Sequence, residues 1–160
     1  REVFGGDAQQ LGLLVGAAGL GALLAALRLA QRAHGQGLER VIVVSALLAG
    51  VGLLLFSQAG SFATALCVLP LTGFGITSLV ATTNTFLQME AEDGLRGRLM
   101  SLFSMVFLGF APLGNLFAGS IAQHLGAPHT VLACAAFCLL GAALLGYGLC
   151  RSVRNTKSTA

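Results

Sequence analysis

Charged residues are scarce in this sequence. Only 9% of the 160 residues are Asp, Glu, Lys or Arg, and 56% are hydrophobic, whereas a soluble domain carries about 25% charged residues. So few charged side chains cannot cover the surface of a water-soluble fold of this size. The deficit therefore argues against a soluble globular domain and makes a lipid bilayer the expected surroundings of the chain.

Nucleic-acid and metal-binding patterns are also missing. No basic run alternates with aromatic residues, and the net charge is only +3, so we expect no nucleic-acid partner. The four cysteines (Cys67, Cys134, Cys138 and Cys150) lie in or beside apolar stretches, with no further His or Cys at the spacing of a metal site. We expect these cysteines to fill apolar helix surfaces, with neither a metal nor a cofactor.

Five long apolar segments dominate what is present. They cover residues 11–29, 41–57, 62–87, 99–123 and 130–150. A helix needs about 20 residues to cross a ~30 Å hydrocarbon core, and the apolar runs are continuous rather than alternating, unlike those of a membrane β-barrel. The sequence therefore predicts an all-α membrane protein with five transmembrane helices. These form one bundle over residues 1–150, followed by a polar tail over residues 151–160.

The basic residues gather at one end of the predicted helices. With five spans, eight of the nine Lys and Arg fall on one side, and only Arg1 falls on the other. The eight are Arg28, Arg32, Arg40, Arg96, Arg98, Arg151, Arg154 and Lys157. Membrane proteins keep such loops in the cytoplasm, so the sequence predicts a cytoplasmic C-terminus and an external N-terminus.

The first and third segments each carry a stripe of small or polar residues at helical spacing. The stripes are Gly12, Gly16 and Gly19 in the first segment, and Pro70, Gly73, Thr77, Ala81, Asn84 and Gln88 in the third. Small residues let helices approach closely in lipid, and a proline near a glycine can bend a helix. Polar groups at membrane depth face a neighbouring helix or a water-filled cavity, and both interpretations stay open for Asn84.

The fourth segment has a comparable stripe. It consists of Ser101, Ser104, Leu108, Pro112, Asn115 and Gly119, with Gly109 and Gly114 as further packing or bending positions. From the two polar stripes we expect a substrate cavity bordered by Thr77, Asn84, Gln88, Ser104 and Asn115. The second and fifth segments show no such stripe, so we expect them at the periphery, facing lipid.

Arg96 and Arg98 stand directly before the fourth segment. The positive end of a helix dipole lies there, so basic residues gain nothing from it. Two explanations remain open, namely topological anchoring and salt bridges at a cytoplasmic gate with Glu90, Glu92 or Asp93. No Asp, Glu or Lys lies inside any apolar segment, so a residue that couples transport to an ion is expected outside this sequence.

Several short motifs resemble one transporter family. They are Phe4-Gly-Gly-Asp-Ala8 leading into Leu11-Gly-Leu-Leu14, Gly19-Leu-Gly-Ala-Leu23, Asn84-Thr-Phe-Leu-Gln88, and Arg96-Gly-Arg98 followed by Leu108-Gly-Phe-Ala-Pro-Leu-Gly114 and Ala118-Gly119. Together they resemble the C-terminal half of a major facilitator superfamily transporter, in the drug and siderophore exporter branch with the enterobactin exporter and macrolide efflux proteins. The loop over residues 30–40 lacks the aspartate of the family's Asp-Arg-x-Gly-Arg pattern, and Arg32 and Arg40 are the matching arginines.

The resemblance implies both an architecture and a function. The five spans would be helices 8 to 12 of twelve, with the first, third and fourth bordering the central cavity and the second and fifth outside it. The implied protein sits in the bacterial inner membrane, pairs with a missing N-terminal half and exports small organic molecules by alternating access, driven by proton antiport. It has no catalytic residues.

Two other functional classes are weighed against export. Ser120 and His124 stand one helical turn apart, as an intramembrane serine hydrolase would require, but no GxSxG motif or acidic partner accompanies them. A helical scaffold or channel subunit without a transport cycle is the other alternative.

Overall fold

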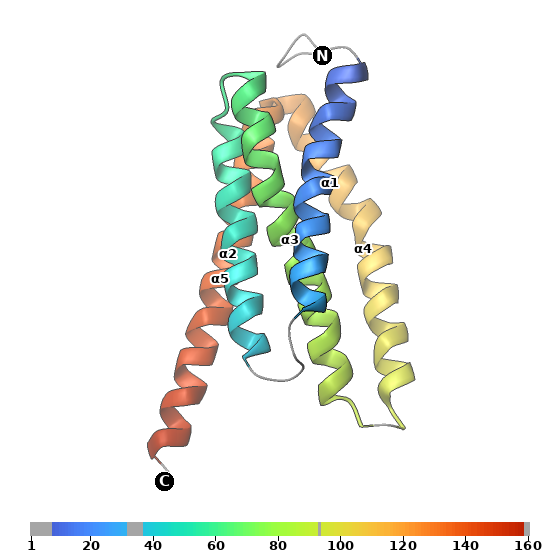
Figure 1. Ribbon diagram of the computed structural model, residues 1–160, viewed down its shortest axis with the longest axis vertical. Helices are drawn as coiled ribbons and strands as arrows, with labels where there is room; N and C mark the ends of the chain where they lie inside the picture. Colours follow the sequence, from blue (N-terminus) through green and yellow to red (C-terminus); the bar gives the residue numbers. More distant parts are fainter. Residues whose placement is uncertain (1–7, 32–36, 93, 159–160) are drawn as a thin grey trace.

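The computed structural model describes residues 8–31, 37–92 and 94–158, and the regular secondary structure in these residues is all α-helical. The helices are α1 (Ala8–Ala30), α2 (Leu38–Ser57), α3 (Phe62–Glu90), α4 (Arg96–Leu125) and α5 (Ala127–Ser158). They run alternately up and down the long axis of the bundle (Figure 1). All five are long and apolar enough to cross a membrane. The predicted all-α membrane fold with five spanning helices is confirmed.

The helix ends have local causes in the sequence. Ser61 and Thr64 form a capping box at the start of α3, in which each side-chain hydroxyl accepts a hydrogen bond from the other residue's backbone N–H at 3.3 Å. Gly126, with a φ of 82°, separates α4 from α5, and glycine adopts this backbone region without a steric penalty. α5 continues as far as Ser158, so helix extends into the segment predicted as a polar tail.

α3 is the central helix of the bundle. It packs along α1 on one side and along α2 on another, and α2 in turn packs along α5. α4 touches α3 and α5 only over a short length and makes no contact with α1 or α2 in the described part of the chain. Figure 1 shows α4 standing at the edge of the bundle.

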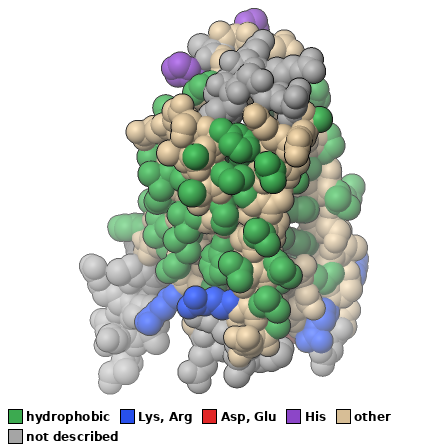
Figure 2. Space-filling view, turned by 45° about the horizontal axis from the view of Figure 1, so that its top comes forward, with side chains coloured by type: hydrophobic (Ala, Val, Ile, Leu, Met, Phe, Trp, Pro, Cys, Tyr) green, Lys and Arg blue, Asp and Glu red, His purple; other side chains and the backbone are tan. Residues whose placement is uncertain are grey.

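The packed interior is built from small side chains. Each buried hydrophobic residue in the described part of the chain is an alanine, whereas Leu, Val and Phe side chains lie mostly on the outside. Figure 2 shows hydrophobic side chains across the visible face, with Lys and Arg toward one end and His at the other. A soluble protein buries its large apolar residues, so the reversed arrangement fits helices whose outer surface meets lipid.

Backbones approach most closely where glycine faces a neighbouring helix. A Cβ atom added to Gly21 would overlap the carbonyl oxygen of Pro70, and one added to Gly73 would overlap that of Ala18. Between α2 and α3, a Cβ atom on Gly75 would lie 2.5 Å from the backbone nitrogen of Ala49. These contacts hold α3 against both neighbours at distances that only glycine permits.

The division of the helices into three with an inner face and two without differs from the packing inside this chain at α2 and α4. α2, expected at the periphery, buries five small residues: Ser45, Ala46, Ala49, Gly50 and Gly52. α4, expected to have an inner face, buries none of its described residues. α2 lies between α3 and α5, where a face of small residues is enough for close packing, and hydropathy does not separate such a face from a lipid-facing one.

Candidate functional site

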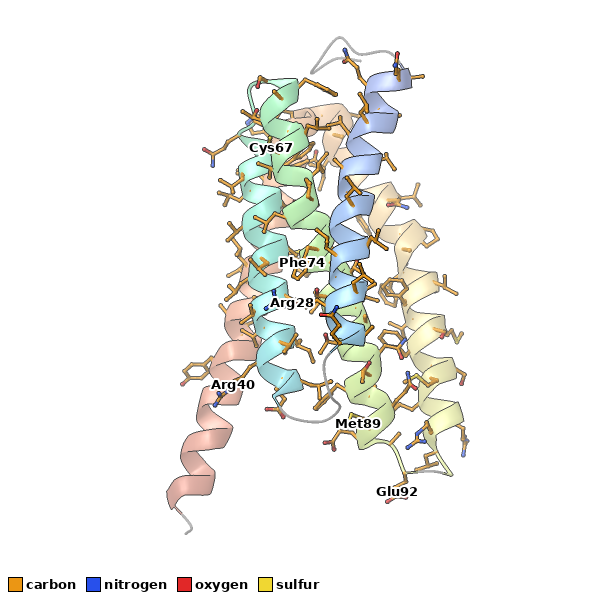
Figure 3. All side chains as sticks on the ribbon, viewed as in Figure 1. Arg28, Arg40, Cys67, Phe74, Met89 and Glu92 are labelled. Carbon is orange, nitrogen blue, oxygen red and sulfur yellow. The ribbon has the colours of Figure 1, made fainter. Side chains whose placement is uncertain are left out.

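A cavity of about 460 Å³ lies between the last turns of α1, the first half of α2 and the middle of α3. Most of its wall is aliphatic or aromatic: Ala25, Leu29, Val41, Val44, Leu48 and Phe74. Arg28 in the last turn of α1 and Arg40 in the first turn of α2 line it together with Gly37. In Figure 3, Arg28 and Phe74 lie close together between α1 and α2, and Arg40 lies nearer the end of the bundle.

Two serines with little exposed surface line this cavity. Ser45 of α2 is 3% exposed, Ser78 of α3 is 6% exposed, and both line the space. Neither hydroxyl makes a hydrogen bond to another residue in the described part of the chain. The cavity therefore combines apolar walls, two guanidinium groups and two serine hydroxyls that bond to no described residue.

A second polar cluster joins the end of α3 to the start of α4. The Gln88 side-chain amide nitrogen donates a hydrogen bond to the side-chain oxygen Oδ1 of Asn84 one turn earlier. Arg96 donates from its Nε to the backbone carbonyl oxygen of Gln88 at 3.0 Å. Carbonyl groups in the last turn of a helix lack helical partners, so the arginine satisfies one of them and ties α4 to α3.

The cavity residues predicted from the sequence fall into two groups. Thr77 and Asn84 are half-buried on α3 and Gln88 is exposed at its end, whereas Ser104 and Asn115 are exposed on α4. A hydrogen bond joins Gln88 to Asn84, and among the described residues neither of them forms a hydrogen bond to Ser104 or Asn115. The substrate cavity that all five would border remains a prediction.

The predicted gate arginines lie at three places. Arg40 lines the cavity at the start of α2, and Arg96 bonds to Gln88. Arg98 is exposed one residue beyond Gly97, and Arg32 lies outside the described residues, as does Asp93. The salt bridges expected between these arginines and the nearby carboxylates therefore remain a prediction.

The small residues and prolines predicted at packing or bending positions also fall into two groups, one at a helix contact and one exposed. Pro70 and Gly73 lie at the crossing of α1 and α3. Gly12, Gly16, Gly19, Gly109, Gly114 and Gly119 have open space where a side chain would be, and Pro112 is exposed. Helix contacts at these exposed positions would require surfaces beyond this chain.

Sequence reasoning did not find the buried polar face of α3. This face carries Thr72, Ser78 and Thr82 and points almost opposite to the predicted stripe through Thr77 and Asn84. Thr72 and Thr82 have buried hydroxyl groups with no hydrogen-bond partner among the described residues. A second small-and-polar row at helical spacing was visible in the sequence, but only the position of α2 distinguishes the two faces.

The catalytic and metal alternatives gain no geometric support. The Ser120 hydroxyl donates to the carbonyl oxygen of Leu116 at 2.8 Å, a bond within its own helix rather than one to His124. Across the described ranges, no cluster of three or more His, Cys, Asp or Glu side chains could hold a metal ion.

Comparison with known proteins identifies the family. A family described as transmembrane secretion effector, within the major facilitator superfamily, matches residues 1–159. No curated protein and no solved structure matches the chain. The match covers nearly the whole sequence and agrees with five membrane-spanning helices. The chain belongs to the transmembrane secretion effector family of the major facilitator superfamily, and is an integral membrane protein of a transporter family.

Proposed function

We propose that this chain forms helices 8 to 12 of a twelve-helix secondary transporter that exports small organic molecules, such as drugs or siderophores, in exchange for protons. Its partners in this role are the lipid bilayer, the substrate and the other half of the same transporter. The family supports transport across a membrane, and the direction, the coupling ion and the substrate class form part of the proposal.

The observation that carries the proposal is the uncovered polar face of α4. Ser104 and Asn115 lie on a membrane-length helix of which no described residue is buried. An amide or hydroxyl group exposed to hydrocarbon costs several kcal/mol when it has no hydrogen-bond partner. Such residues normally face protein or a water-filled cavity, so further helices of the transporter are expected to cover this face.

Alternating access gives α3 and α4 complementary roles in this proposal. The two halves of such transporters rock about a binding site near the middle of the membrane. Asn84 on α3 and Asn115 on α4 would contribute hydrogen-bonding groups to that site, while α2 packs along α3 and α5 packs along α2. Since no acid lies within the apolar segments, the proton-coupling carboxylate would belong to another helix of the transporter.

The proposed orientation of the bundle in the membrane rests on the arginines at the helix ends. Arg28, Arg40, Arg96 and Arg98 all stand at helix ends on one side of the bundle. We place this side in the cytoplasm, because cytoplasmic loops of membrane proteins are rich in Lys and Arg. The membrane in this proposal is the bacterial inner membrane. The turns after α2 and α4 would then face outward.

Cysteine accessibility in the complete transporter tests the cavity. Asn84→Cys and Asn115→Cys are made after the four native cysteines are replaced by alanine, because Cys67 and Cys134 are exposed and would react themselves. Both new thiols should react with a water-soluble maleimide in membranes, and transported substrate should slow the reaction. Phe137→Cys on α5, at a position 81% exposed, should resist labelling as a lipid-facing control.

Labelling of Asn84→Cys and Asn115→Cys only after denaturation would remove both residues from a water-filled cavity. It would favour the helical scaffold over the exporter. Reaction that is unaffected by substrate would support a water-filled channel instead.

A further inference from the structure

The cavity between α1, α2 and α3 is separate from the substrate site proposed above. None of Thr77, Asn84, Gln88, Ser104 and Asn115 lines it. It lies at the end of the bundle that carries the basic residues, with Arg28 and Arg40 on opposite helices. Its volume of about 460 Å³ falls within the range of ordinary small-molecule sites.

The charge of the cavity selects an anion. Arg28 and Arg40 are exposed, and neither makes an ion pair or hydrogen bond with another described residue. Glu39 stands between them in sequence but does not line the cavity. α2 also begins there at Gly37 without a side-chain cap, so its first backbone N–H groups and the positive end of its dipole add to the same field.

The interior of the cavity selects a ligand that is more than an inorganic ion. Five other helical hydroxyls, those of Ser57, Thr85, Ser101, Ser120 and Thr130, donate to carbonyl groups of their own helices or turns. Ser45 and Ser78 do not, although both residues are more than nine-tenths buried. Their hydroxyl groups are therefore free to bond to a ligand that enters the cavity.

We propose that this cavity binds an amphiphilic organic anion. Its acidic group, a phosphate, sulfonate or carboxylate, lies between Arg28 and Arg40, where forked guanidinium donors fit such oxygens. Its apolar body packs on Phe74, Leu29 and Val44, and a polar group on it reaches the hydroxyls of Ser45 and Ser78. The ligand comes either from the aqueous phase or from an anionic phospholipid of the adjoining leaflet, and both present the same chemistry to these residues.

The test uses 1-naphthyl phosphate as probe, with the complete transporter in phosphatidylcholine nanodiscs. This chain contains no Trp, so its own residues add little background to the naphthyl fluorescence. The wild type should bind the phosphate at least tenfold more tightly than uncharged 1-naphthol. Arg28→Gln and Arg40→Gln should each weaken binding about tenfold or more, the range for a charge-assisted hydrogen bond. Ser45→Ala with Ser78→Ala should weaken it by a smaller factor.

Matched controls separate the site from general surface charge. Arg98→Gln removes an exposed arginine from the same end of the bundle, outside the cavity, and should leave binding within twofold. Ser57→Ala removes a hydroxyl that already donates to Leu54, and should also leave it unchanged. Arg40→Lys keeps the charge and should restore part of the affinity lost in Arg40→Gln, which excludes misfolding as the cause.

A second arm distinguishes the source of the ligand. If a phospholipid occupies the cavity, phosphatidylglycerol in the nanodisc should displace the probe, and native mass spectrometry should find anionic lipid on the wild type but not on the double Gln variant. If the ligand is water-borne, phosphatidylglycerol should not compete. Equal affinity of the wild type and the Arg28→Gln/Arg40→Gln variant for 1-naphthyl phosphate would overturn the proposal, whatever the outcome of the transport assays.

Discussion

Single glycines set the distance between α1 and α3. Gly21 and Gly73 each face a backbone carbonyl of the opposite helix so closely that a methyl group would overlap it. The backbone cannot move aside as a flexible side chain would, so the whole helix must shift. Gly16 and Gly19 lie on the same helix as Gly21 but have nothing within 4 Å.

We therefore predict that Gly21→Ala destabilises the bundle and that Gly16→Ala does not. Overpacking of a tight interface costs about 1–3 kcal/mol, and the loss should be seen as a lower midpoint of thermal unfolding in detergent. Gly16→Ala should match the wild type or exceed it slightly, because alanine favours helix. Equal midpoints for the two variants would mean that α1 and α3 do not meet at Gly21.

Thr82 places a polar group inside the bundle without a hydrogen bond to compensate for its burial. The residue is fully buried, and its hydroxyl has no hydrogen-bond partner among the described residues. Thr82→Val keeps the shape and removes the unsatisfied group, so we predict stabilisation by about 1 kcal/mol, measured as a higher unfolding midpoint.

Thr64→Val provides the contrast for Thr82→Val. The Thr64 hydroxyl accepts from the backbone N–H of Ser61 in the capping box of α3, so this change should destabilise. A destabilised Thr82→Val would instead indicate that Thr82 has a polar partner in the complete transporter.

At the scale of the element, the turn between α3 and α4 links two helices that otherwise touch little. Arg96 reaches from the first residue of α4 to the Gln88 carbonyl in the last turn of α3. An arginine gains nothing from the dipole at the start of its own helix. Arg96 instead stabilises the negative C-terminal end of α3. This contact with α3 explains the position of Arg96 better than any effect on α4.

We predict that Arg96→Gln impairs transport more than Arg98→Gln, and that the double variant is the weakest. Glutamine is shorter and uncharged, so it loses the bond across the turn, whereas the Arg98 side chain forms no bond to another described residue. Initial transport rates in vesicles, normalised to inserted protein, provide the measurement. Insertion that falls equally in both single variants, with unchanged rates, would support anchoring alone.

At the scale of the whole molecule, the distribution of charge determines how the bundle sits in the membrane. The described Lys and Arg side chains occupy one end of the bundle and the described His side chains the other (Figure 2). Between the two ends, many large hydrophobic side chains are exposed. Such an asymmetry orients helices during insertion.

We predict that a cysteine at Ala59, in the turn between α2 and α3, reacts with a membrane-impermeant maleimide on intact cells. A cysteine at Gly94, in the turn between α3 and α4, should react only after the cells are permeabilised. Both residues lie between helices, at opposite ends of the bundle. The reverse pattern would invert the proposed topology.

Much of this architecture could be read from the sequence, because lipid imposes simple requirements. The five helices correspond to the five apolar segments within three residues, except that α5 continues to Ser158 rather than ending at residue 150. The agreement arises because only helices satisfy the backbone of such segments in hydrocarbon. Arg40, Asn84 and Gln88 were singled out because charged and polar groups stand out against apolar surroundings, but their roles at a gate and a substrate cavity remain predictions.

Which face of each helix is buried could not be read in the same way. The buried faces consist of alanine, glycine, serine and threonine. Hydropathy does not distinguish a face of such small residues from the other faces of the same helix. α2 was therefore misjudged as peripheral, and the cavity residues Ser45 and Ser78 were not identified.

The sequence by itself determined the number of helices, their character and the end of the bundle that carries the basic residues, because each depends on the transfer of whole segments between water and lipid. Only the tertiary structure decided that α3 is central, that Gly21 and Gly73 meet the opposite backbone, and that Arg28 and Arg40 share a cavity with Ser45 and Ser78. These features depend on how the helices rotate and cross. Shape complementarity between small side chains determines that rotation and crossing.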